Sequence, residues 1–211
     1  MKIALDIHNN SFWLMANKCL YWKEQSTLVV SDVHLGKASH FQKAGLPIPS
    51  LIGHEDLNAI AKVIFDIRPK TVIFLGDLFH SNYNEEWNWF KTWMDHFPET
   101  QFKLVIGNHD QAILPMLPEN LDAIEEWFEP PFLFTHEPVE EMKKDLFYVS
   151  GHLHPGVVIK GKGRQYAKLP CFWKKKNQLI MPAFGNLTGA MKMPTKGAEI
   201  YAIFENEIVK I

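Results

Sequence analysis

Metal-binding residue types follow directly after five short apolar runs of this 211-residue sequence. The run at residues 102–106 leads to Asn108, for example, and the run at 146–150 leads to His152. Imidazole, carboxylate and amide ligands without thiolate suit Mn²⁺, Fe²⁺ or Zn²⁺, so these run ends predict a metal centre. The candidate ligands are Asp32, His34, Asp77, Asn108, His136, His152 and His154.

The number of candidate ligands indicates two ions. A single ion that keeps an open position uses about three protein ligands, whereas two ions about 3.5–4 Å apart are typical of hydrolytic sites. Such a pair neutralises a bound phosphate and lowers the pKa of water towards 7. Each motif alone has an ordinary explanation as a turn or a buried histidine, but their combination predicts a binuclear metallohydrolase.

The elements that carry these residues are typical of a layered α/β protein. In open α/β sheets, functional residues gather outside the carboxyl ends of the strands, so distant run ends can meet at one place. We therefore expect strands at residues 28–31, 72–75, 102–106, 132–135 and 146–150. Apolar spacing and breaker residues predict helices over residues 36–45, 50–68 and 85–97. Strands and turns dominate after residue 150, and we expect one domain over residues 1–211.

Composition places the chain among globular proteins. Hydrophobic residues make up 46% of the sequence, which is enough for a core, and no apolar run approaches the roughly 20 residues that span a bilayer. Asp6 and His8 interrupt the apolar residues at the start, so a signal peptide is not expected. The two cysteines, Cys19 and Cys171, form no C-x-x-C motif. A cytoplasmic protein without membrane contact is expected.

Charge is distributed unevenly along the chain. The net charge is −2, but residues 1–140 carry 10 basic and 19 acidic side chains, whereas residues 141–211 carry 12 and 5. The basic part includes Lys160, Arg164 and Lys168 and could attract an anionic substrate. A solvated lysine face is the alternative, and we favour it for the run at 174–176.

The ordered motifs resemble the calcineurin-like metallophosphoesterase superfamily. Its pattern is D-x-H, G-D, G-N-H-[DE], a lone histidine and G-H-x-H, and all five blocks occur in order within residues 32–154. The resemblance implies a four-layer αββα sandwich, with mixed β-sheets flanked by helices. It also implies two divalent metal ions, for which we expect Mn²⁺, with Fe²⁺ or Zn²⁺ as alternatives.

The resemblance assigns a role to each site residue. Asp77 bridges the two ions, His109 protonates the leaving oxygen and Asp110 orients the imidazole of His109. The first ion is held by Asp32, His34, Asp77 and His154. The second ion is held by Asp77, Asn108, His136 and His152.

Two residues outside the metal ligands, His80 and Arg164, are candidate substrate contacts. Many superfamily members carry an arginine after the G-D motif, where this chain has Leu78-Phe79-His80-Ser81. Because Arg68 and Arg164 are the only arginines, we do not expect an arginine clamp. His80 is interpreted as a substrate contact or as a support for the metal ligands. Arg164, in the basic segment, is a second candidate substrate contact.

A closer resemblance covers nearly the whole chain. Segments 31–37, 75–81, 161–165, 169–172 and 182–185 are similar to the bacterial ligase-associated DNA-repair metallophosphoesterases. This resemblance implies a phosphodiesterase or nuclease acting on DNA, associated with an ATP-dependent DNA ligase and a helicase.

Alternative functions stay open at this point. The weak net charge favours a phosphodiesterase of nucleotides or other small diesters, because proteins that bind duplex DNA are usually basic. A non-catalytic protein-binding scaffold would be expected to lose ligands or His109, and a protein phosphatase fits the closer resemblance poorly. Aromatic residues of the 85–97 helix could pack internally or against a second copy, and we expect a homodimer.

Overall fold

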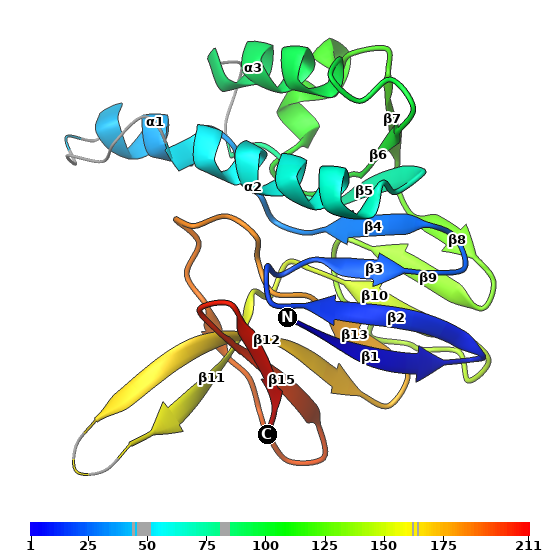
Figure 1. Ribbon diagram of the computed structural model, residues 1–211, viewed down its shortest axis with the longest axis vertical. Helices are drawn as coiled ribbons and strands as arrows, with labels where there is room; N and C mark the ends of the chain where they lie inside the picture. Colours follow the sequence, from blue (N-terminus) through cyan, green and yellow to red (C-terminus); the bar gives the residue numbers. More distant parts are fainter. Residues whose placement is uncertain (44, 46–51, 81–84, 162, 164) are drawn as a thin grey trace.

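The computed structural model describes residues 1–43, 45, 52–80, 85–161, 163 and 165–211 of the chain. This part consists of two β-sheets and a layer of helices (Figure 1). The first sheet has the order β1 (Lys2–Ile7), β2 (Asn10–Met15), β3 (Leu20–Trp22), β4 (Thr27–Val30), β5 (Thr71–Leu75), β6 (Gln101–Val105) and β7 (Leu121–Ile124).

The second sheet is built mainly from the later part of the chain. Its strand order is β14 (Met191–Lys192), β11 (Pro155–Lys160), β12 (Tyr166–Lys175), β13 (Gln178–Ile180), β10 (Phe147–Ser150), β9 (Phe132–Thr135) and β8 (Trp127–Glu129). Two further strands, β15 (Glu199–Phe204) and β16 (Glu207–Lys210), extend it from β12. The expectation of a mostly β layer after residue 150 is confirmed.

The central strands are apolar on both faces because both faces are covered. On β5, Phe74 belongs to a core shared with the helices, whereas Ile73 and Leu75 belong to the core between the two sheets. Strands buried on both faces read as continuous apolar runs. This explains why the five runs seen in the sequence are all strands.

Three α-helices are described: α1 (Lys37–Lys43), α2 (Ile52–Ile67) and α3 (Glu85–Met94). A 3-10 helix, η1 (Gln111–Met116), follows β6. Leu57, Ile60 and Ile64 recur on one face of α2 and pack on the first sheet, as the helical period requires. In the described part of the chain, no helix is long and apolar enough to cross a membrane.

The mixed α/β sandwich is confirmed, with one difference in its outer layers. Helices α2 and α3 cover the outer face of the first sheet (Figure 1), but no α-helix among the described residues covers the second sheet. The outer face of the second sheet instead buries a small cluster that includes Trp173 and Ile200. Met193 and Ala198, from the segment after β14, pack against that cluster and take the place of a helix.

The aromatic residues of α3 pack internally. Phe90 is fully buried, Trp87 is 6% exposed, and Trp93 packs against the same core. Trp89 lies against His54 of α2, with the ring centroids 3.6 Å apart. Of the two alternatives left open for these side chains, internal packing is the one observed.

Strand direction brings the candidate ligands to one edge. Strands β4, β5 and β6 are parallel neighbours, and β9 and β10 are parallel neighbours in the second sheet. The ends of the two sheets are joined by main-chain hydrogen bonds, from Phe184 N–H to the Ser31 carbonyl at 2.8 Å and from Gly185 N–H to the Asp32 carbonyl at 3.1 Å. The site therefore lies where both sheets end.

Candidate metal centre

Two groups of side chains converge at the shared edge. Donor atoms of Asp32, His34 and His154 lie within 4.8 Å of one another, and so do those of Asp77, His136 and His152. The remaining candidate ligand joins the second group, because Asn108 Oδ1 lies 3.1 Å from His136 Nε2. All seven candidate ligands are thus brought together, in the two sets expected from the family pattern.

Asp77 faces both groups with its two carboxylate oxygens. Its Oδ1 lies 3.4 Å from His136 Nε2, and its Oδ2 lies 4.0 Å from His34 Nε2. The side chain is almost completely buried. One carboxylate positioned between two sets of nitrogen donors has the geometry of a ligand shared by two ions.

The donors of the second group are arranged to face a cation. Nδ1 of His136 lies 3.1 Å from the Leu75 carbonyl, an arrangement in which Nδ1 donates and Nε2 keeps its lone pair for a metal. That Nε2 lies 3.1 Å from Asn108 Oδ1 and 3.2 Å from His152 Nδ1. Acceptor atoms gathered in this way fit a cation between them.

The first group contains buried nitrogen atoms that the protein leaves unsatisfied. Both ring nitrogens of His34 are buried without a hydrogen-bond partner in the described part of the chain. Burial lowers the pKa of His34 to about 3, with Lys37 adding to the effect, so the imidazole is neutral as a metal ligand must be. His154 Nε2 lies 3.1 Å from Asp32 Oδ1, in poor hydrogen-bond geometry. These residues also fit a divalent ion.

Charge in the second group is balanced between His136 and Asp77. Burial opposes the charged form of both residues, but their hydrogen bond and mutual attraction outweigh it. The pKa of Asp77 is consequently about 2, and that of His136 is raised to about 9. A metal ion at this position would replace the proton of His136, so ion binding there would release a proton.

The backbone at the ligands adopts a conformation that the sequence analysis did not foresee. Five of the seven candidate ligands have positive φ: Asp32 (53°), His34 (53°), Asp77 (49°), His152 (63°) and His154 (45°). Residues other than glycine rarely adopt a positive φ, and each residue that does so costs on the order of 1–3 kcal/mol of folding free energy. The sharp turns aim side chains from the strand ends towards the gap between the sheets.

Two glycines permit the close approach of the loops. A Cβ atom at Gly151 would lie 1.9 Å from Ser31 Oγ, and one at Gly107 would lie 2.3 Å from both the main-chain nitrogen and Oδ1 of Asp77. Any larger residue would therefore displace a candidate ligand. Glycine is needed at these two motif positions because a Cβ atom would collide with the neighbouring loop, and because glycine suits the turns.

His109 lies beside the two groups and is accessible. Its main-chain N–H donates to Asp77 Oδ1 at 3.0 Å, and its Nε2 lies 3.9 Å from Asp77 Oδ2. The side chain is 41% exposed. An exposed imidazole next to the shared carboxylate is positioned to reach a substrate, although its ring also lies with those of His34 and His80 in a group that could hold an ion.

Asp110 is held by hydrogen bonds from the backbone. Its carboxylate is completely buried and accepts hydrogen bonds from the main-chain N–H groups of Phe79, at 3.1 Å, and Gly107, at 3.0 Å. No hydrogen bond from Asp110 to the His109 imidazole is found among the described residues, and the expectation that Asp110 orients that ring stays a prediction. Because Phe79 follows β5 and Gly107 follows β6, Asp110 fastens the β6 loop to the β5 loop.

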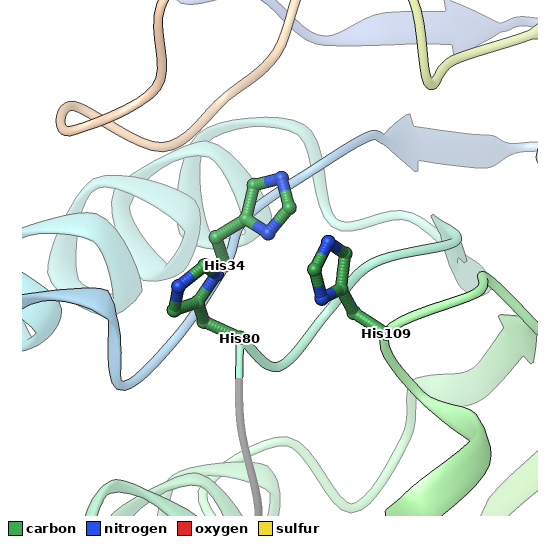
Figure 2. A group of neighbouring side chains, drawn as sticks. All are labelled: His34, His80 and His109. Carbon is green, nitrogen blue, oxygen red and sulfur yellow. The ribbon is translucent and has the colours of Figure 1, made fainter. Parts of the chain in front are cut away.

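The two candidate substrate contacts from the sequence are His80 and Arg164. His80 lies in a group of three imidazoles whose donor atoms are within 4.8 Å of one another (Figure 2). Its ring centroid is 5.3 Å from that of His109 and 5.6 Å from that of His34. Arg164 lies outside the described residues.

The comparisons with known proteins agree with this geometry. A family model described as calcineurin-like phosphoesterase matches residues 26–185. The chain belongs to this family. It is therefore a metal-dependent phosphoesterase, a hydrolase.

Among solved structures, the chain of this phosphoesterase is similar to the nuclease MPE of Pseudomonas putida. The similarity covers 100% of both chains, with a TM-score of 0.82 and 23% sequence identity, which shows a common fold. The match to Yfce, a phosphoesterase from E. coli, is weaker. It covers 88% of this chain and 97% of the Yfce chain, with a TM-score of 0.41 and 14% sequence identity. No curated protein sequence matches the chain significantly.

Two cavities of opposite charge flank the metal centre of this phosphoesterase. A cavity of about 370 Å³ beside His154 is lined by Lys18 and Lys168. Another, of about 390 Å³ beside His136, is lined by Glu125 and Glu137. The sequence analysis missed Lys18 because it is far from every motif, and nothing in its local sequence marks it.

Proposed function

We propose that this phosphoesterase hydrolyses phosphodiester bonds in nucleic acid, as a cytoplasmic, Mn²⁺-dependent DNA-repair nuclease. The observation that carries the proposal is Asp77, which faces two sets of ligands while exposed His109 lies beside it. Bound divalent ions would supply Lewis acidity towards the phosphate and the attacking water. The P. putida protein of the same fold is named a nuclease.

The side chains of the site divide the remaining work among them. His109 would donate a proton to the leaving oxygen, a role that typically contributes 10²–10⁴-fold to the rate. His80, beside His109, would contact an oxygen of the phosphate. The buried Asp110 would hold the loop that carries Asn108 and His109 in position. A contact from Arg164 to the substrate is part of the proposal, although it rests on the sequence alone.

The biological setting is proposed from the closer sequence resemblance. Segments such as 161–165 and 169–172 support an association with an ATP-dependent DNA ligase and a helicase. A homodimer also belongs to this proposal.

A second candidate is a phosphodiesterase of nucleotides or other small diesters. The acidic cavity beside His136 favours it, because Glu125 and Glu137 would repel the next phosphate of a polynucleotide on that side. The overall charge of −2 points the same way. Activity on oligonucleotides decides between the two candidates.

The test starts with protein stripped of metal by a chelator. With Mn²⁺ restored, we expect hydrolysis of bis(p-nitrophenyl) phosphate in preference to p-nitrophenyl phosphate, followed by cleavage of labelled DNA oligonucleotides. Zn²⁺ and Mg²⁺ are tested in parallel to identify the metal. Turnover of small diesters without cleavage of any oligonucleotide would favour the second candidate. Preference for the monoester would contradict both.

A further inference from the structure

The cavity beside His154 leads from the metal centre to a projecting hairpin. Lys18 and Lys168 line this cavity, and each donates from Nζ to one main-chain carbonyl, of Phe184 at 3.0 Å and of Ala190 at 2.8 Å. An ammonium group has three donors, so each lysine keeps donors for an anion. The cavity is therefore a positively charged continuation of the site.

The hairpin formed by β11 and β12 extends away from the two sheets (Figure 1). Successive side chains of a strand point to opposite faces, so Tyr166, Lys168 and Pro170 share one face of β12. Lys168 and Pro170 line the cavity, which identifies this face as the one continuous with the metal centre. Lys160 pairs with Tyr166 across the hairpin and lies on the same face.

The opposite face of the same hairpin serves the core. Val157 and Cys171 are buried in the cluster on the outer face of the second sheet, and Leu169 packs against it. Val157 pairs with Leu169 in the register of the two strands. Packing therefore accounts for one face, while Lys160, Tyr166 and Lys168 on the other face are exposed among the residues that the structure describes.

The open face has the chemistry of a nucleic-acid platform. Tyr166 is 77% exposed, which is unusual for a large aromatic side chain, and exposed Lys160 and Lys168 flank it. Proteins that hold single strands combine aromatic rings, on which bases stack, with cations that follow the backbone. The cavity on the other side of the centre is acidic, through Glu125 and Glu137, and would repel the strand there.

We propose that the Tyr166 face, defined as Lys160, Tyr166, Lys168 and Pro170, binds the nucleic-acid strand that leads to the scissile phosphate. This inference rests on the proposed function and specifies where its substrate lies. The strand enters from the His154 side of the metal centre. Tyr166 stacks on a base, and Lys168 contacts a phosphate next to the one that is cleaved.

Binding of a fluorescent single-stranded oligonucleotide, measured by anisotropy, tests the inference. The parent protein is the His109→Ala variant with Mn²⁺, in which cleavage does not interfere, and each further substitution is added to this parent. Tyr166→Ala is expected to weaken binding roughly fivefold or more, whereas Tyr166→Phe keeps the ring and the affinity. Lys168→Ala is expected to reduce the slope of log affinity against log salt by about 0.7.

Two matched controls separate the face from general effects. Ile159→Ala changes an exposed side chain on the opposite face of the hairpin, and Lys70→Ala removes one positive charge at the other end of the sheet, just before β5. Both should bind like the parent. Equal binding by Tyr166→Ala, Lys168→Ala and the parent would overturn the inference, as would a parent that binds no oligonucleotide.

Hydrolysis distinguishes failure of this inference from failure of the proposed function. In the otherwise wild-type chain, Tyr166→Ala and Lys168→Ala should each raise KM for an oligonucleotide, and Tyr166→Ala should leave hydrolysis of bis(p-nitrophenyl) phosphate unchanged. If neither variant changes KM for the oligonucleotide or for bis(p-nitrophenyl) phosphate, binding of the strand by the Tyr166 face is refuted. The proposal that the protein is a phosphodiesterase is then unaffected. No diester hydrolysis by the wild-type chain would refute the proposed function, while weaker oligonucleotide binding by the variants would still support the face.

Discussion

The main-chain N–H of His152 donates a hydrogen bond to Oδ2 of Asp32 at 3.1 Å, although 120 residues separate the two in the chain. This bond joins the end of β10 in the second sheet to the end of β4 in the first. The Ser31 hydroxyl donates to the same Oδ2 at 2.6 Å, so the carboxylate is fixed from both sides. The candidate metal centre therefore forms only when the two sheets are packed together.

Metal binding should stabilise the fold for that reason. At a free Mn²⁺ concentration of 100 times Kd, an ion that binds only the folded state adds about 2.7 kcal/mol. For a chain of this size, that corresponds to a rise in Tm of roughly 5–10 °C over chelator-treated protein. Differential scanning fluorimetry measures it, and Asp77→Asn should lose most of the rise. The same Tm with chelator and with Mn²⁺ would contradict this prediction.

His109→Ala should separate catalysis from metal binding. The imidazole is exposed beside Asp77 and belongs to neither ligand group around the two ions, so the Mn²⁺-dependent rise in Tm should persist. Turnover should fall by roughly 10²–10⁴-fold for substrates with alkoxide leaving groups. The loss should be smaller for p-nitrophenyl esters, whose leaving group needs little protonation. Equal losses for both substrate types would argue against a general acid.

Asp110→Asn tests the structural role of the buried carboxylate. An amide has one acceptor oxygen, so either the Phe79 or the Gly107 N–H loses its partner, at a cost of about 1–3 kcal/mol of unfolding free energy. Urea unfolding measures this loss. The control is Asp122→Asn, which removes an exposed ion pair with Lys103 and should lower the unfolding free energy by less than about 1 kcal/mol. Normal stability with a turnover loss like that of His109→Ala would favour the orienting role.

Asp56 should make stability depend on pH. Burial raises its pKa to about 6, against hydrogen bonds from Asn186, while the unfolded value is about 3.9. A raised pKa favours the folded state below the unfolded value, and this contribution is lost as the pH rises through 6. Relative to Asp56→Asn, the wild type should therefore lose up to about 3 kcal/mol between pH 4 and pH 7. Urea unfolding with chelator present measures this difference, and a constant difference would refute it.

Local sequence was sufficient for the strands and the candidate ligands. Apolar runs such as 72–75 are strands because both of their faces are buried, and the residue that follows each run is placed at the sheet edge by the end of the strand itself. These relations span only a few residues, so they can be read along the chain. The family motifs added the ligand sets, because their order identifies the superfamily.

Long-range packing decided the rest. The second sheet lacks a helical layer in the described residues because Met193 packs against the cluster that includes Trp173, a contact that local sequence does not reveal. Asp110 looked like a partner of its neighbour His109, but the β5 loop approaches closely enough for Phe79 N–H to reach its carboxylate.

The sequence by itself determined which residues could bind metal and that they would lie at strand ends, because those properties depend on side-chain chemistry and local apolar pattern. The tertiary structure alone decided how the backbone turns at Asp32 and Asp77, and where Lys18 lies beside the site. Those features depend on how two sheets meet, and that geometry is set by contacts between residues more than 100 positions apart, such as Asp32 and His152.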